Sequence, residues 1–162
     1  MNLEKLFDIQ RVLNERIVEE HNLDISQLRN KKFLALLTEL GELANETRCF
    51  KYWSSKGPSA DRVILEEYVD CLHFILTIGL DFDFQGVIPP AEEMDSPDLT
   101  QRFINLYLDV NELVICASPD SYQELLKDFF GLGHALGFTK DDIYNGYLAK
   151  NRINHLRQDE LY

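Results

Sequence analysis

The chain has 162 residues and a formal net charge of −12, from 28 acidic and 16 basic side chains. Apolar residues make up 45% of the sequence, which excludes a disordered acidic tail and allows a folded domain of ordinary size. The negative charge argues against binding to nucleic acids or membranes, because both present polyanionic surfaces. We therefore expect a partner that is cationic, or one whose binding a cation mediates.

The cysteines and the N-terminus indicate the compartment. Cys49, Cys71 and Cys116 are widely spaced and form no CxxC motif, so they predict neither a disulfide framework nor a zinc knuckle. The first residues lack the cationic start and apolar stretch of a signal peptide. The longest nearly apolar run, residues 69–80, is interrupted by an acid and a histidine and is too short to span a bilayer. We expect a cytoplasmic protein with a single domain over residues 1–162.

Helical periodicity dominates the first half of the chain. Apolar residues at helical spacing predict a helix over about residues 2–20 and a second over about 30–50. A third predicted helix, over about 60–83, is apolar on nearly every side, as is usual for a helix at the centre of a bundle. Ser59 is in position to cap this helix. Residues 84–97 are expected to form a loop.

Capping residues predict three helices in the second half. Two serine–proline–aspartate runs, 96–98 and 118–120, each offer an N-cap, a proline at the first helical position and an acid near the positive helix end. Thr139 and Asp142 resemble a capping box. The predicted helices cover about 98–117, 119–136 and 140–158. No alternating run of β-branched residues indicates a strand, so the expected fold is an all-α bundle of about six helices.

Two acidic pairs are candidate metal ligands. Glu39 with Glu42, and Glu67 with Asp70, are spaced i, i+3, which puts both carboxylates of a pair on one side of a helix. Four convergent carboxylates suit Mg²⁺ or Mn²⁺. The first pair is equally compatible with a solvated surface, whereas the second shares its side with apolar residues, where unpaired carboxylates are costly. His73 is expected to be a core residue or to lie behind the ligands, because a di-iron site needs a second carboxylate–histidine pair.

A basic and amide face lies near the C-terminus. Lys150, Asn154 and Arg157 are spaced i, i+4, i+7 and share one side of a helix, with Asn151 and Gln158 beside them. Lysine and arginine donate charge-assisted hydrogen bonds to phosphate oxygens, and asparagine bonds to a sugar or base. The alternative is a cationic last turn that complements the helix dipole.

Two further features suit a heterocyclic base. Gln10 and Asn14 are spaced i, i+4 beside apolar residues of the first helix, where amides suit a neutral heterocycle or simply mark the edge of the core. Trp53, the only tryptophan, follows the second helix. It is positioned either to stack on a base or to anchor its loop.

The order of these motifs resembles that of a known family. The sequence resembles the dimeric all-α dUTPases in the order of four motifs: an ExxE pair, an aromatic-Lys-Tyr-Trp run, an ExxD pair and Lys-Asn-x-x-Asn-x-x-Arg-Gln. These dUTPases belong with MazG-like enzymes to the all-α nucleoside triphosphate pyrophosphatases. The resemblance runs from Ile9 to Gln158, although residues 84–135 match only as helices. It implies a homodimer that hydrolyses dUTP to dUMP and pyrophosphate with Mg²⁺, for which Mn²⁺ is a possible substitute. This reaction limits uracil incorporation into DNA and supplies dUMP, and dUDP is a further candidate substrate.

The resemblance also implies residue roles. One glutamate of the first pair, Glu39 or Glu42, would activate the attacking water, while a carboxylate-held metal would neutralise phosphate charge. The implied metal ligands are Glu39, Glu42, Glu67 and Asp70. The implied substrate contacts are Gln10, Asn14 and Trp53 at uracil, Asn154 at the deoxyribose, and Lys150 and Arg157 at the phosphates, with Asn151 beside them.

Two alternatives stay open. The first is a MazG-like or dCTP-directed pyrophosphatase, which would use the same four carboxylates with a different base pocket. The second is a non-enzymatic acidic helical protein that binds a protein or a metal. In addition, larger relatives continue past Arg-Gln with a basic stretch that this sequence lacks. We therefore expect phosphate closure to be weaker, or to use Lys51, Lys56 or a partner subunit.

Overall fold

The computed structural model describes residues 2–90 and 98–160. Within these residues the chain forms six α-helices, one short 3-10 helix and no strand, which confirms the predicted all-α fold class. Periodicity did not indicate the 3-10 helix, because it is only three residues long. The elements are α1 (Leu3–Glu20), η1 (Ile25–Gln27), α2 (Arg29–Thr47), α3 (Asp61–Asp81), α4 (Leu99–Ile115), α5 (Pro119–Ala135) and α6 (Lys140–Asp159).

The connection between α2 and α3 differs from its prediction at both ends. Helix α2 ends at Thr47, three residues early, because Arg48 adopts the left-handed conformation with φ of 58°. Ser59 does not cap α3, so that prediction was wrong: the N-cap is Ala60, which makes no side-chain capping bond. The Ser59 hydroxyl instead donates to the carboxylate of Glu46 on α2. The Ser59 side chain therefore bonds to an acceptor on α2 and not to a backbone N–H in the first turn of α3.

The caps of the last three helices follow the sequence more closely. Ser118 and Thr139 cap α5 and α6, as predicted. Both also close a capping box, which the sequence indicated only for Thr139. Helix α4 is capped by Asp98, whose side chain accepts a hydrogen bond from a backbone N–H of the first turn. The prediction of Ser96 as this cap was wrong, and Ser96 and Pro97 themselves lie outside the described residues.

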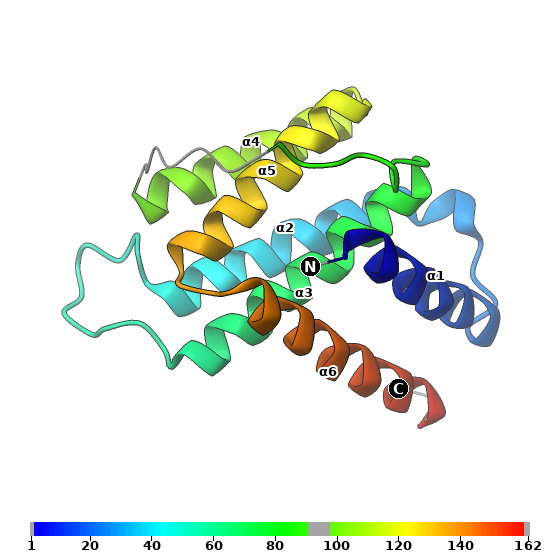
Figure 1. Cartoon of the computed structure of the whole chain (residues 1–162), viewed down its shortest axis with the longest axis horizontal. Coiled ribbons are helices and arrows are strands. Elements are labelled where there is room, and N and C mark those ends of the chain that lie inside the picture. Colours follow the sequence, from blue (N-terminus) through cyan, green and yellow to red (C-terminus); the bar gives the residue numbers. More distant parts are fainter. Residues whose placement is uncertain (1, 91–97, 161–162) are drawn as a thin grey trace.

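Helix α3 forms the centre of the bundle, as its apolar sequence predicted. It contacts α1, α2, α5 and α6, and Figure 1 shows α2 running alongside it while α4 and α5 pair at the edge of the molecule. Close packing requires Gly79, because a Cβ at this position would lie 2.2 Å from the hydroxyl of Tyr122. That hydroxyl donates to the backbone carbonyl of Ile75, so a buried polar group is satisfied inside the core.

The apolar surface of α3 is thus covered by the chain itself. Its residues from Tyr68 to Gly79 are almost all buried. Across residues 2–90 and 98–160, no helix combines the length and the apolar character that a membrane span requires.

Candidate functional site

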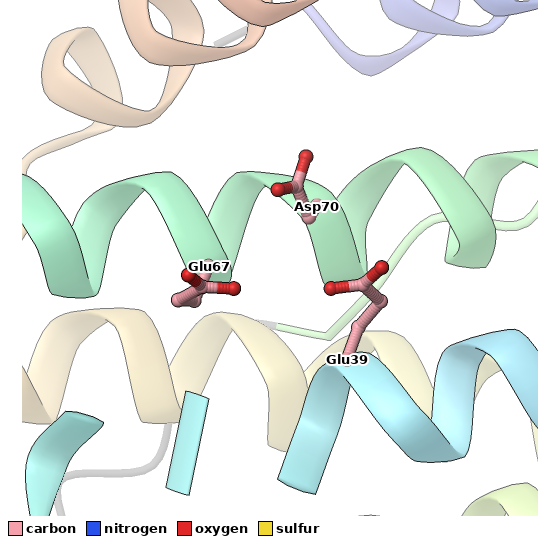
Figure 2. Close-up of side chains that lie close together, drawn as sticks. All are labelled: Glu39, Glu67 and Asp70. Atoms are coloured by element: carbon pink, nitrogen blue, oxygen red, sulfur yellow. The ribbon is translucent and has the colours of Figure 1, made fainter. Parts of the chain in front are cut away.

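Three of the four predicted carboxylates converge where α2 packs against α3. Oxygen atoms of Glu39, Glu67 and Asp70 all lie within 4.8 Å of one another, with Glu39 on α2 and the other two on α3, as Figure 2 shows. The i, i+3 spacing places Glu67 and Asp70 on the same side of α3. Glu42 is exposed and stands outside this group, although its charge acts on Glu39 and Glu67.

The carboxylate group (Glu39, Glu67 and Asp70) carries more negative charge than its surroundings neutralise. Burial raises the pKa of Glu39 to about 7, and repulsion from Asp70, Glu42 and Glu67 adds to the effect. Burial and the charge of Asp70 also raise the pKa of Glu67. For Asp70, burial raises the pKa more than an ion pair lowers it. Closely spaced oxygen ligands that resist ionisation are a donor set suited to a hard divalent cation.

Lys150 is the main cation beside this group. It lies on α6 with its Nζ 2.6 Å from Asp70 Oδ2 and 3.2 Å from Glu66 Oε1. Burial lowers the pKa of Lys150, but the bonds to Asp70 and Glu66 raise it further, so the net direction is upward. The lysine predicted to bind phosphate therefore already has carboxylate partners and holds α6 against α3.

A cavity of about 470 Å³ opens beside the carboxylate group, between α1, α2, α3 and α6. The structure brings together at its wall seven of the predicted site residues: Gln10, Asn14, Glu39, Asp70, Lys150, Asn154 and Arg157. Three others, Glu42, Glu67 and Asn151, are not part of the lining. The cavity thus joins the acidic pairs to the amide and basic faces, which are far apart in the sequence.

Trp53 lies away from this cavity. Its side chain is 64% exposed and packs edge-on against Tyr52 and near Phe50. These residues belong to the connection between α2 and α3, which extends from the body of the molecule in Figure 1. Within one chain, Trp53 is therefore not a wall of the cavity.

Gln10 forms the centre of a buried amide network (Gln10, Asn14, His73, Thr77 and Tyr147). Its Nε2 donates to Asn14 Oδ1 at 2.9 Å and to Thr77 Oγ1 at 3.1 Å. Its Oε1 accepts from the Tyr147 hydroxyl at 2.7 Å and lies 2.7 Å from His73 Nδ1. Since an amide has two hydrogens to donate and one oxygen with two lone pairs, the hydrogen-bonding capacity of Gln10 is fully used within the protein.

His73 is neutral and has a defined tautomer. Burial lowers its pKa to about 3, with a further contribution from the charge of Lys150. Because Gln10 Oε1 can only accept, Nδ1 of His73 carries the hydrogen and Nε2 carries the lone pair. That Nε2 is buried without a hydrogen-bond partner among the described residues, and His73 lines the cavity. This nitrogen is therefore a buried polar atom whose hydrogen-bonding capacity the described residues leave unused.

Several residues at the cavity were missed by reasoning from sequence. His73 and Thr77 are polar residues spaced i, i+4 in an apolar helix, and this pattern was the available signal for a polar wall. Lys31 and Lys32 also line the cavity, and the Lys32 ammonium lies 2.7 Å from Asp81. Nothing in the sequence separates these lysines from ordinary surface lysines.

Comparison with known proteins identifies the family. A family model described as dUTPase matches residues 2–162. A search of curated proteins found no match. The family model covers nearly the whole chain, and the all-helical structure agrees with it. The chain therefore belongs to the all-α family of dUTPases, enzymes that hydrolyse dUTP.

Proposed function

We propose that the protein is a Mg²⁺-dependent dUTP diphosphatase that forms dUMP and pyrophosphate in the cavity between α1, α2, α3 and α6. The observation that carries this proposal is the convergence of the carboxylate group, two of whose members line a cavity that also bears amides and cations. The carboxylates and cations suit a metal-bound triphosphate, and the amides suit a neutral base. Mn²⁺ has the same preference for oxygen ligands and would substitute for Mg²⁺.

The proposed metal ligands are the carboxylate group together with Glu42. When bound, the divalent cation would neutralise phosphate charge and polarise the phosphoryl oxygens. Glu39 would take the proton of the attacking water, because it belongs to the carboxylate group and also lines the cavity where the water would stand. The water oxygen then bonds to the α-phosphorus, and the bond from this phosphorus to the pyrophosphate oxygen breaks.

The cationic side chains of α6 would stabilise the departing pyrophosphate. Arg157 lines the cavity and is exposed, so its guanidinium is accessible to phosphate oxygens. Lys150 would contact phosphate while it keeps its bond to Asp70. Lys31 lines the same cavity and adds a third positive charge. Asn154 lines the cavity about one helical turn from both Lys150 and Arg157 on α6, and we assign it to the deoxyribose.

A turnover assay tests this function. Purified protein with Mg²⁺ should release pyrophosphate from dUTP far faster than from dCTP, dTTP or dATP, and a chelator should abolish release. Equal rates on all four nucleotides would support a MazG-like pyrophosphatase of broad specificity. A preference for dCTP would assign the enzyme to that substrate, and no release from any nucleotide would favour a non-enzymatic binding protein.

We also propose that the enzyme is a homodimer, as the resemblance implies. Helix α3 is buried within the chain and does not support this proposal, but α4 does. Ile104, Leu108 and Ile115 are 49%, 62% and 84% exposed and lie at helical spacing on one side of α4. Exposed apolar residues on one helical face are typical of a protein interface. If the dimer brings the α2–α3 connection of one chain to the cavity of the other, Trp53 would reach the base there.

Mixing two variants tests whether the sites are shared. Light scattering on a sizing column should give the mass of a dimer, and Leu108→Glu should give that of a monomer. Trp53→Ala and Asp70→Asn should each be nearly inactive, whereas their mixture should regain activity after subunit exchange. The recovered site would take its carboxylates from one chain and its tryptophan from the other. A mixture that stays inactive after subunit exchange would contradict an active site shared between the two chains.

Further proposals concern the extent of the domain, the relationship to other enzymes, and the location of the protein. We propose one all-α domain over residues 1–162, because the family model and the helices both extend over nearly the whole chain. The relationship to MazG-like enzymes is proposed from the shared ExxE and ExxD pairs. A cytoplasmic location and action on free nucleotides rather than nucleic acids fit the unpaired Cys49, Cys71 and Cys116 and the net charge of −12.

A further inference from the structure

We infer that Tyr147 is a positioning residue that sets the hydrogen-bonding polarity of the base pocket and thereby selects uracil over cytosine. The inference rests on the proposed function, because it takes Asn14 as the group that faces the base. Tyr147 itself is completely buried and does not line the cavity. It acts through Gln10, whose amide its hydroxyl contacts, and its ring stacks on that of His73 with centroids 4.3 Å apart.

The hydrogen bond that Tyr147 donates determines which group donates and which accepts at each step of the network as far as the cavity. The Tyr147 hydroxyl donates to Gln10 Oε1, so the Gln10 Nε2 must point the other way, where it donates to Asn14 and Thr77. The Thr77 hydroxyl accepts this bond and donates its own hydrogen to Asn14 Oδ1 at 3.1 Å. Because Asn14 Oδ1 then accepts two hydrogen bonds, only the Nδ2 donor of Asn14 is left for a ligand.

The same direction of bonding defines the group that the network presents to a base. Gln10 Oε1 fixes the hydrogen of His73 on Nδ1, and the Nε2 of His73 is buried. Asn14 lines the cavity, so the group that the network presents there is the Nδ2 donor of Asn14. This donor complements the O4 acceptor of uracil. Cytosine has the opposite group at this position, an amino donor at C4.

The network has a second arrangement, with every bond reversed. If the Gln10 amide turned over, its Nε2 would donate to His73 Nδ1 and its Oε1 would accept from Asn14. Asn14 would then present an acceptor, which is the group that the C4 amino donor of cytosine requires. In this arrangement the Tyr147 hydroxyl would have to donate to the backbone carbonyl of Leu6, which lies 3.4 Å away compared with 2.7 Å for Gln10. The shorter bond favours the arrangement that accepts uracil.

Tyr147→Phe tests the inference, because it removes the hydroxyl and keeps the ring that stacks on His73. We expect the ratio of kcat/KM for dUTP to that for dCTP to fall about tenfold, the effect of one misdirected buried hydrogen bond. The loss for dUTP should lie mainly in KM, since the metal site is untouched. Thr77→Val removes the hydroxyl between Gln10 and Asn14 and should lower the same ratio. Tyr122→Phe is the matched control, because its hydroxyl is also buried but bonds to Ile75.

The outcomes separate this inference from the proposed function. If the wild-type enzyme prefers dUTP and both Tyr147→Phe and Thr77→Val keep that preference, the positioning role is refuted and the dUTPase assignment stands. A parallel loss of kcat/KM on dUTP and dCTP would show a merely structural role and would also refute it. If the wild-type protein hydrolyses neither nucleotide, the proposed function fails and the inference fails with it.

Discussion

Two groups of polar side chains at the cavity differ in how their charges and hydrogen bonds are satisfied. We call the carboxylate group the carboxylate wall and the amide network the amide wall. At the carboxylate group, Glu39, Glu67 and Asp70 stand close together with one lysine beside them, and their pKa values are raised. In the amide network, Gln10 has every hydrogen-bonding position filled by the protein. The first wall depends on an ion from solution to become favourable, whereas the second is rigid before any ligand arrives. Charge chemistry and base selection are thereby assigned to separate groups of side chains, although α3 contributes residues to both.

The largest expected effect comes from the carboxylate wall. Asp70→Asn and Glu42→Gln should each lower turnover at least about a thousandfold, because each removes a negative oxygen ligand while the fold keeps its core. Pyrophosphate release measures the loss, and helical circular dichroism should match the wild type. Glu112→Gln, at an exposed position on α4, is the control. Near-normal activity in both variants would contradict the assignment of the metal site.

A substitution in the amide wall should lower the stability of the fold. Gln10→Leu leaves the hydroxyl of Tyr147 and the Nδ1–H of His73 buried without their acceptor. We expect the free energy of unfolding to fall by about 2–4 kcal/mol, as measured in urea. Gln101→Leu replaces an exposed glutamine on α4 and should change stability by less than about 0.5 kcal/mol. Equal stability of both variants would mean that the network is not a rigid element.

The sequence predicted what depends on local spacing and failed where distant segments meet. Helix periodicity, the caps at Ser118 and Thr139 and the i, i+3 acidic pairs are all set by neighbours along one helix. Lys150 lies 80 residues from Asp70, and Tyr147 lies 137 residues from Gln10, so their bonds depend on how α1, α3 and α6 pack. For this reason the sequence indicated Lys150 as a phosphate ligand and gave no sign of its carboxylate partners.

The third prediction concerns competition between protons and metal at the carboxylate wall. With a pKa of about 7, Glu39 is largely protonated below neutrality and largely ionised above it. A divalent cation must displace this proton, so its apparent affinity should weaken about tenfold for each pH unit below 7 and level off above it. Calorimetric titration of the nucleotide-free protein with Mn²⁺ measures the profile. An affinity that is constant between pH 5.5 and 8 would mean that Glu39 is not at the metal site.

The smallest expected effect is on thermal stability. It distinguishes Glu39, which we place at the metal site, from Asp109, which is a partly buried acid away from that site. Burial and neighbouring carboxylates also raise the pKa of Asp109 to about 7, and one of its oxygens has no hydrogen-bond partner among the described residues. Glu39 and Asp109 therefore share the same sign of linkage. In each case the folded-state pKa exceeds the unfolded value, so the penalty is absent below pH 4, grows toward pH 7 and is complete above it.

Neutral substitutions should remove this penalty in both regions. Glu39→Gln and Asp109→Asn should each raise the Tm of the metal-free protein by about 2–4 °C at pH 8 and have little effect at pH 4. Mg²⁺ should distinguish them, because it stabilises the folded state only where carboxylates converge. The wild type and Asp109→Asn should both gain stability on adding Mg²⁺, whereas Glu39→Gln should gain much less. An equal gain in Glu39→Gln would show that the cation binds elsewhere, and the contrast between the two walls would then lose its basis.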